Sequence, residues 1–364
     1  MMSDFLSTVF AAWSKAWPIL FAVLFFGLII LSHELGHFFF AKLFNVKVNK
    51  FAIGMGPPIL KKKRGETEYS LRIFPIGGYV IMEGEDEESF DERSFDNAKV
   101  WKRMIIIAAG AVVNLVLALF IVMFMLSQES LIGTPQINRF FENSTTQQSG
   151  LEKDDVIKMI NGRNVYSEYD LSFLLSRDKD GLVDFVVERD GQKIAVNNVR
   201  FEMRENSGGG ESMVLDFIIV GVEPTFLSVI KYSALEAVSF ARIVWISLFD
   251  LVTGQYGFKD LSGPIGTVSY IAQVTQQTVQ TTDLTPILTM LTLVSVNIGV
   301  FNLLPIPALD GGKLFFLFIE LIRRKKINPK YESLIHAAGF MLLIGMMAAV
   351  SLSDIIKLVR GDLA

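Results

Sequence analysis

The chain has 364 residues, of which 51% are hydrophobic and only 20% charged, whereas a soluble domain carries about 25% charged residues. The apolar residues gather in runs close to the roughly 20 residues that cross a bilayer, which excludes a soluble single-domain enzyme. The net charge of −4 gives no reason to expect nucleic acid as a partner. Because cysteine is absent, any metal must be held by histidine and carboxylate side chains.

Four apolar runs predict transmembrane helices, and therefore a polytopic α-helical membrane protein. Lysine and arginine are concentrated between the first and second runs and between the third and fourth, so we expect both connections to be cytoplasmic. Both termini and the long connection between the second and third runs then lie outside. The four runs cover residues 17–43, 104–126, 286–305 and 334–352.

A further apolar stretch, 226–252, has helical spacing but contains Lys231, Glu236, Arg242 and Asp250. Counting it as a fifth crossing would reverse the last two spans and place the basic cluster at 323–326 outside, against the charge rule. We therefore predict an amphipathic helix that lies on the membrane surface.

The segment 128–222 is predicted to form a small folded module outside the membrane. Short β-type runs at 184–189, 193–196 and 214–220 are separated by turn signals such as Asn161-Gly162 and Asp190-Gly191, and 207–210 is expected to be a flexible loop. The predicted organisation is a first transmembrane segment (1–45), a cytoplasmic-side β region with an acidic loop (46–102), a second span (103–127), the outer module (128–222), an interfacial helical segment (223–282), a third span with its cytoplasmic loop (283–333), and a fourth span with the tail (334–364).

The first span contains the motif HELGH, an unusual interruption because ionisable residues are costly inside a membrane. His33 and His37 are four residues apart, so on a helix both imidazoles project from one face, with Glu34 beside them. This pattern is typical of metal hydrolases, in which two neutral histidines bind zinc and the glutamate takes a proton from water. The alternative is a pair of buried histidines that only form hydrogen bonds.

A catalytic zinc site usually has three protein ligands and one open position. Asp310 is the candidate for the third ligand, because it follows the third span at a membrane depth comparable with His33 and His37 and is flanked by glycines. The alternative for Asp310 is a helix cap or turn residue. We interpret His336 as an interfacial histidine rather than a ligand, and Asn114 as an interhelical hydrogen-bonding residue.

HELGH (33–37) and NLLPIPALDGG (302–312) resemble the two signature motifs of the site-2 protease family of intramembrane zinc metalloproteases. The resemblance extends over nearly the whole chain. FAIGMGP (51–57) with FPIGGYV (74–80) resembles the family's membrane-reentrant β-hairpin region, AAGAVVNLVLA (108–118) its second-span motif, and LSGPIG (261–266) a segment of its bacterial RseP-like branch.

The resemblance implies that His33, His37 and Asp310 hold Zn²⁺ and that Glu34 is the catalytic base. It also implies that Asn302 holds the substrate backbone or polarises a carbonyl, which an amide can do because it both donates and accepts hydrogen bonds. The β region, with Gly54, Gly56 and Gly78, is expected to pair with an unwound substrate by strand addition. The alternative for this region is an ordinary amphipathic hairpin.

The outer module resembles a single PDZ domain, an α+β fold, through SGLEKDDVIKMINGRNV (149–165), although Asp154 replaces the usual glycine. We expect it to exclude untrimmed substrates rather than to capture peptides. The resemblance implies a bacterial inner-membrane enzyme that cleaves trimmed anti-sigma factors and signal-peptide remnants, with membrane lipids as the other partner. The competing hypotheses are a non-proteolytic PDZ scaffold with a structural metal and a zinc transporter.

Overall fold

The structure is a computed structural model that describes residues 2–85, 89–205, 211–255, 263–281 and 283–360. The chain forms two compact units, one made of residues 1–118 and 248–364 and the other of 119–247. The predicted loop at 207–210, residues 86–88 of the acidic loop and the first two residues of LSGPIG lie outside the described residues.

Within the described ranges, four helices are long and apolar enough to cross a membrane, as the sequence predicts. A helix suits this environment because it satisfies its own backbone hydrogen bonds. The qualifying segments are Ala16–Leu43 of α1 (Met2–Leu43), all of α2 (Val100–Gln128), all of α7 (Thr285–Leu303) and Lys330–Arg360 of α9 (Pro329–Arg360).

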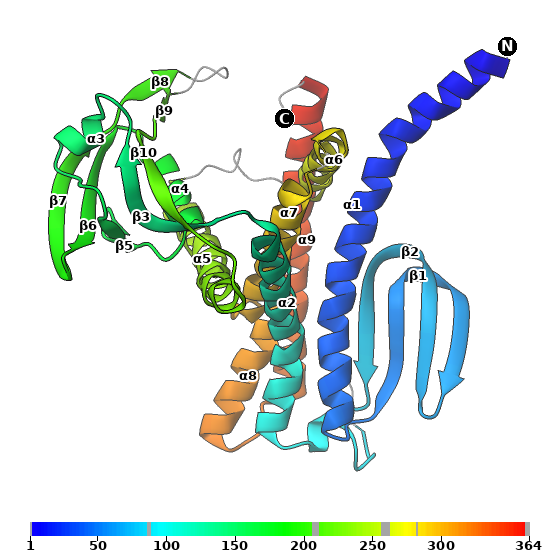
Figure 1. Ribbon diagram of the computed structural model, residues 1–364. Coiled ribbons are helices and arrows are strands. Elements are labelled where there is room, and N and C mark those ends of the chain that lie inside the picture. Colours follow the sequence, from blue (N-terminus) through cyan, green and yellow to red (C-terminus); the bar gives the residue numbers. More distant parts are fainter. Residues whose placement is uncertain (1, 86–88, 206–210, 256–262, 282, 361–364) are drawn as a thin grey trace. The chain divides into compact units, whose positions relative to one another are not determined.

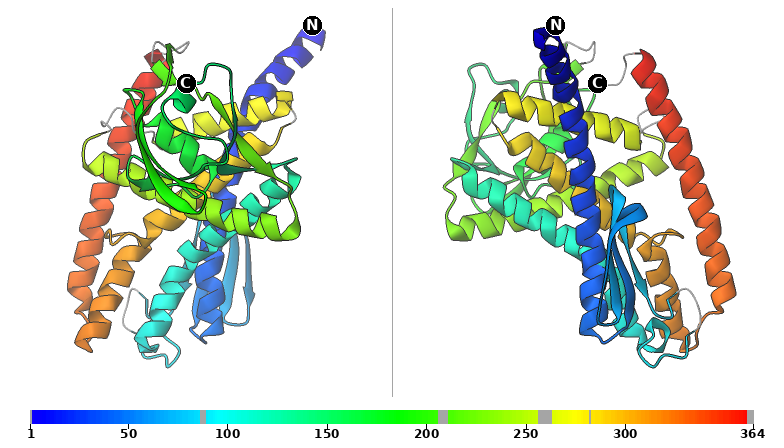
Figure 2. Two further views of the ribbon diagram at one scale, coloured as in Figure 1. Left: turned by 60° about the vertical axis from the view of Figure 1, so that its left-hand side comes forward. Right: turned by 90° about the vertical axis from the view of Figure 1, so that its right-hand side faces the viewer.

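Two shorter helices also belong to the described part of the first unit. The helix α6 (Pro264–Thr281) lies against α1 (Figure 2). The helix α8 (Asp310–Arg323) covers residues that were predicted to form the end of a span and a cytoplasmic loop. Lys313 and Arg323 indicated a loop, but most residues of this helix are apolar and follow helical spacing. A short 3₁₀ turn, η1 (Phe95–Asn97), precedes α2.

The first unit also contains an antiparallel sheet of two long, bent strands, β1 (Val48–Arg64) and β2 (Thr67–Met82), and β2 packs beside α1 (Figure 1). The start of β1 pairs with both ends of β2, since Phe51 lies opposite Val80 and also opposite Tyr69. The end of β1 pairs with the start of β2. The two strands therefore form four adjacent ribbons, in which 78–82 is an outer ribbon. Glycines at positive φ accompany the bends: Gly54 (84°), Gly56 (86°) and Gly77 (83°).

The second unit contains a six-stranded sheet with the order β10-β3-β4-β6-β7, and with β5 paired to β4. The predicted turns at Asn161-Gly162 and Asp190-Gly191 are confirmed, because all four residues have positive φ. The elements are β3 (Ile132–Phe140), α3 (Thr145–Gln148), β4 (Val156–Ile160), β5 (Arg163–Asn164), α4 (Glu168–Ser176), β6 (Leu182–Arg189), β7 (Gln192–Arg200), the pair β8 (Met203–Glu205) and β9 (Glu211–Met213), and β10 (Phe217–Val222).

The helix α5 (Phe226–Val252) covers the residues whose spacing predicted an amphipathic helix. Up to Ser247 it belongs to the second unit, where it packs on α4 through polar contacts. Ser239 donates a hydrogen bond of 2.6 Å to Asp170, and Arg242 lies 3.1 Å from the same carboxylate. The apolar core of this unit lies between the sheet and α4, with Ile246 of α5 packed against it.

Candidate metal centre

Two histidines of α1 face each other within the first unit. His33 and His37 are each only 7% exposed, and their Nε2 atoms are 3.1 Å apart. Because the residues are four apart on a helix, both rings leave the same face. Helical spacing therefore accounts for the pair, while the ring orientation depends on neighbouring helices.

The carboxylate of Asp310 joins the two histidines from the start of α8. Its Oδ2 atom is 2.9 Å from His33 Nε2 and 3.2 Å from His37 Nε2. The ligand atoms of these three residues all lie within 4.8 Å of one another, and they are the one such group among the described residues. Burial raises the pKa of Asp310, but hydrogen bonds with His33 and His37 outweigh it and hold this pKa below its ordinary range.

The loop before α8 is shaped to deliver Asp310. A Cβ atom on Gly311 would lie 2.0 Å from the carbonyl oxygen of Leu304, so only glycine allows α8 to start this close to the end of α7. Ala308 has a φ of 78°, and its N–H donates a hydrogen bond of 2.9 Å to Nδ1 of His336. His336 is therefore not part of the metal group but supports the loop that carries Asp310.

Residues of the helix α2 contact both histidines and fix the position of their rings. His37 Nδ1 is 2.8 Å from the carbonyl oxygen of Ile106, which can only accept, so Nδ1 carries a proton and a metal ion would be bound through Nε2. A Cβ atom on Gly110 would lie 2.4 Å from His37 Nε2 and 2.8 Å from His33 Cε1. The local sequence around Gly110 does not predict this role, because the contact joins residues that are 73 positions apart.

Asn114 links the helices around the site through hydrogen bonds, as predicted. It is fully buried on α2, and its Oδ1 accepts a hydrogen bond of 2.6 Å from Ser32, the neighbour of His33. The backbone carbonyl oxygen of Asn114 accepts a hydrogen bond of 2.8 Å from the Ser295 hydroxyl of α7. These bonds link the three helices at the level of the metal group, so the interhelical interpretation of Asn114 is confirmed.

Glu34 lies between the metal group and the sheet. The backbone N–H of Val80 donates a hydrogen bond to its carboxylate. A Cβ atom on Gly78 would lie 3.4 Å from Glu34 Cγ and 2.9 Å from the carbonyl oxygen of Ala52. The outer ribbon 78–82 therefore runs directly beside the glutamate of HELGH.

These residues fit a zinc ion. Two imidazole nitrogens and one carboxylate oxygen form a donor set that zinc prefers, and three protein ligands leave a coordination position open for chemistry. The Nε2 atoms of His33 and His37 and the Oδ2 atom of Asp310 lie 2.9–3.2 Å from one another. A structural site would need a fourth protein ligand, which the group of three does not provide.

Comparison with known proteins identifies the family to which the chain belongs. The model of peptidase family M50, the site-2 protease family, matches residues 21–346. The chain belongs to peptidase family M50. A Clostridium perfringens protein that carries zinc metalloprotease in its name is 38% identical over 339 residues, which are 93% of this chain and 98% of that protein. The zinc metalloprotease RasP of Bacillus licheniformis is 29% identical over 419 residues, 92% of this chain and 98% of its own.

A third relative is the regulator of sigma-W protease RasP of Bacillus subtilis, which is 28% identical over 422 residues, 92% of this chain and 97% of its own. The M50 match confirms the predicted resemblance, and the chain is a membrane-spanning zinc metalloprotease. Its metal and its class of enzyme are those that HELGH predicted.

Among the other residues predicted to contact substrate in this M50 protease, only Gly78 lies beside Glu34. Asn302 is half-buried in the last turn of α7, and within the described residues no hydrogen bond joins its amide to the metal group. A Cβ atom on Gly54 would lie 2.4 Å from the carbonyl oxygen of Phe74, and one on Gly56 2.8 Å from the Phe74 ring. Both glycines allow close packing within the β1–β2 sheet.

Proposed function

We propose that this M50 protease cleaves single-span membrane proteins inside the bilayer, with His33, His37 and Asp310 as zinc ligands and Glu34 as the general base. The observation that carries the proposal is the convergence of the three ligand atoms within 4.8 Å on helices of a membrane-spanning unit. Both histidines belong to the span Ala16–Leu43. An ionisable cluster placed there is a functional site by default, because its burial is costly.

The chemistry follows from the position of each group. When bound, a zinc ion supplies Lewis acidity, which acidifies water and polarises a peptide carbonyl. Glu34 accepts the proton of the attacking water and later returns it to the leaving amine. The Val80 N–H keeps the Glu34 carboxylate oriented. His37 is held in one tautomer by the carbonyl of Ile106, and Asp310 supplies the negative charge of the ligand set.

A substrate helix must unwind before its carbonyl can be attacked, since its carbonyl groups are otherwise bonded within the helix. The outer ribbon 78–82 offers a place for the unwound segment, because in the described structure it pairs only with β1. Strand addition at this edge would satisfy the exposed backbone groups next to Glu34. This arrangement supports the predicted role of the β region and of Gly78.

We further propose that the outer module is a single PDZ domain that excludes untrimmed substrates. Peptide capture by strand addition needs an unpaired strand edge. Among the described residues β10 ends the sheet and pairs only with β3, so strand pairing alone does not decide between the two roles. The replacement of the usual glycine by Asp154 supports exclusion over capture.

The name of the Bacillus subtilis relative, regulator of sigma-W protease, supports trimmed anti-sigma factors as one substrate class. Remnants of signal peptides have the same geometry, a single apolar span without a large outer domain. The bacterial relatives support a bacterial inner-membrane location, and the distribution of lysine and arginine supports an orientation in which both termini and the outer module are periplasmic. A scaffold with a structural metal is not supported, because the site has three ligands rather than four.

The experiment is cleavage of a model single-span substrate by the full-length protein in vesicles. The variant Glu34→Gln keeps the shape of the side chain but removes the base, so we expect zinc to be retained and cleavage to fall by about 10²–10⁴-fold. Glu332→Gln, a glutamate outside the metal group, is the matched control and should cleave normally. Cleavage at the normal rate by Glu34→Gln would contradict the assignment.

A further inference from the structure

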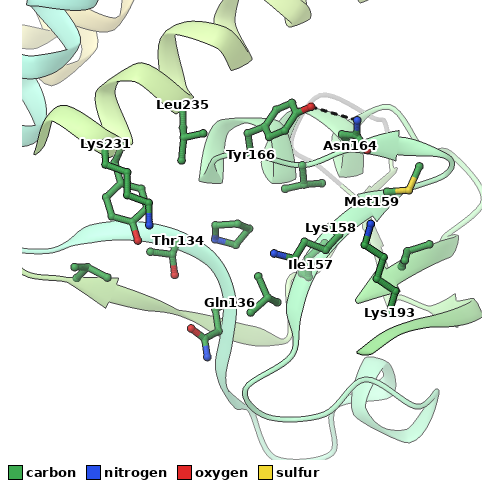
Figure 3. A pocket seen from close by; sticks show the side chains of 16 residues that line it. Thr134, Gln136, Ile157, Lys158, Met159, Asn164, Tyr166, Lys193, Lys231 and Leu235 are labelled. Carbon is green, nitrogen blue, oxygen red and sulfur yellow. Dashed lines mark hydrogen bonds between the residues drawn. The ribbon is translucent and has the colours of Figure 1, made fainter. Parts of the chain in front are cut away.

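An open groove lies on the second unit, and two of its lining residues, Ile157 and Val165, also belong to the core of that unit. Its volume is about 530 Å³, and strands β3 and β4 form one side while α5 contributes Lys231, Tyr232 and Leu235 (Figure 3). A volume of this size is typical of a ligand site. Val156, Val186 and Leu235 supply apolar lining.

The groove carries positive charge. Three lysines line it from three different elements: Lys158 from β4, Lys193 from β7 and Lys231 from α5 (Figure 3). Lys158 is 3.1 Å from Glu188, which is not part of the lining, and Lys231 lies over the ring of Tyr232. Among the described residues that line the groove, none is acidic. The charge is therefore complementary to an anion.

The helix that forms one side of the groove carries apolar side chains on more than one face. It buries Phe240 and Val244 together with polar residues such as Ser239, while it also exposes Leu227, Val238 and Trp245. Trp245 is 55% exposed. A helix that turns large apolar residues outward lies with that face in the headgroup region of a bilayer, where tryptophan is also enriched. The positive charge of the groove and the exposed apolar residues of this helix together favour an anionic lipid as the occupant.

We propose that the groove binds the phosphate headgroup of an anionic phospholipid, and that α5 with this lipid anchors the outer module to the membrane. The lysine amines pair with the phosphodiester, and the apolar lining receives the start of the acyl chains. The proposal does not depend on the protease chemistry. Attraction between basic side chains and an anionic lipid weakens with salt, because exposed charges are screened beyond a Debye length.

The test uses the full-length protein in dodecyl maltoside micelles with phosphatidylglycerol that carries a photoactivatable group near its headgroup. Mass spectrometry of the digested protein locates the label. We expect label in the segments that line the groove, and little with phosphatidylcholine of the same design. The double variant Lys193→Gln/Lys231→Gln should reduce lipid affinity at this site about thirtyfold, at about 1 kcal/mol for each lysine near the surface.

The matched control is Lys153→Gln/Lys179→Gln, which removes the same charge from exposed positions of the module outside the groove. It should label like the parent chain, and Lys193→Arg/Lys231→Arg should restore labelling. Equal labelling by both lipids, or unchanged labelling in the groove double variant, would overturn the proposal. Loss of the label in excess inorganic phosphate, or lysine-dependent binding of an acidic peptide without lipid labelling, would equally overturn the assignment to a lipid.

Discussion

Gly110 provides a sharp test of how α2 holds the metal ligands. In Gly110→Ala the new Cβ would lie 2.4 Å from His37 Nε2, 2.7 Å from His37 Cε1 and 2.8 Å from His33 Cε1. Ordinary contacts of such atoms are about 3.5 Å, so a ring must move by about 1 Å. The His37 ring cannot move freely, because its Nδ1 is bonded to Ile106.

A misplacement of about 1 Å can lower an enzymatic rate by about 10²-fold, and disturbing the support of a metal ligand weakens metal binding by about 10–100-fold. We therefore expect Gly110→Ala to lose about 10²-fold in kcat/KM and to bind zinc less tightly. The measurement is cleavage of a single-span substrate in vesicles together with the zinc content of the purified chain.

Gly345→Ala is the matched control, because it is the same substitution in a membrane helix where nothing lies within 4 Å of the new Cβ. It should leave zinc content and cleavage unchanged. If Gly110→Ala also retained full zinc binding and full cleavage, α2 would not position the histidines in the way described.

Three further predictions concern the ligand set, its supporting loop and the outer module. Asp310→Ala should lower zinc content at limiting zinc far more than Glu332→Gln does, and equal zinc binding would contradict a ligand role. His336→Ala leaves the Ala308 N–H without its partner, so cleavage should fall about fivefold, which corresponds to about 1 kcal/mol, while zinc is retained. Zinc loss without a change in kcat would contradict this. Burial, and then the charges of Glu168 and Glu129, raise the pKa of Glu236 to about 8 from 4.5. The folded module keeps this proton while the unfolded chain releases it, so stability should fall as the pH rises through that window, and Glu236→Gln should remove the slope in thermal unfolding.

The parts of the fold that depend on local pattern follow from the sequence. The four spans, the helix α5 and the turns at Asn161-Gly162 and Asp190-Gly191 are all visible as apolar runs, helical spacing or turn residues. HELGH predicts two facing histidines because helical geometry alone places them together. Asp310 required the additional estimate of membrane depth and the family motif.

Features that depend on contacts between distant segments left no readable signal. The role of Gly110 comes from a ring 73 residues earlier, and that of His336 from a loop 28 residues before it. The helix α8 was missed because Lys313 and the basic cluster at 323–326 indicated a cytoplasmic loop, although most residues of the helix are apolar. The double pairing of β1 with both ends of β2 depends on bends that alternation of residue types does not reveal.

The most direct measurement of the central claim is mass spectrometry of the products that the full-length protein releases from a single-span substrate in vesicles, before and after zinc is removed and restored. We predict a cut within the apolar segment of the substrate, no cut without zinc, and recovery when one zinc per chain is restored. A cut outside the apolar segment, or a cut that persists at the same rate after the zinc has been removed, would contradict intramembrane hydrolysis at His33, His37 and Asp310.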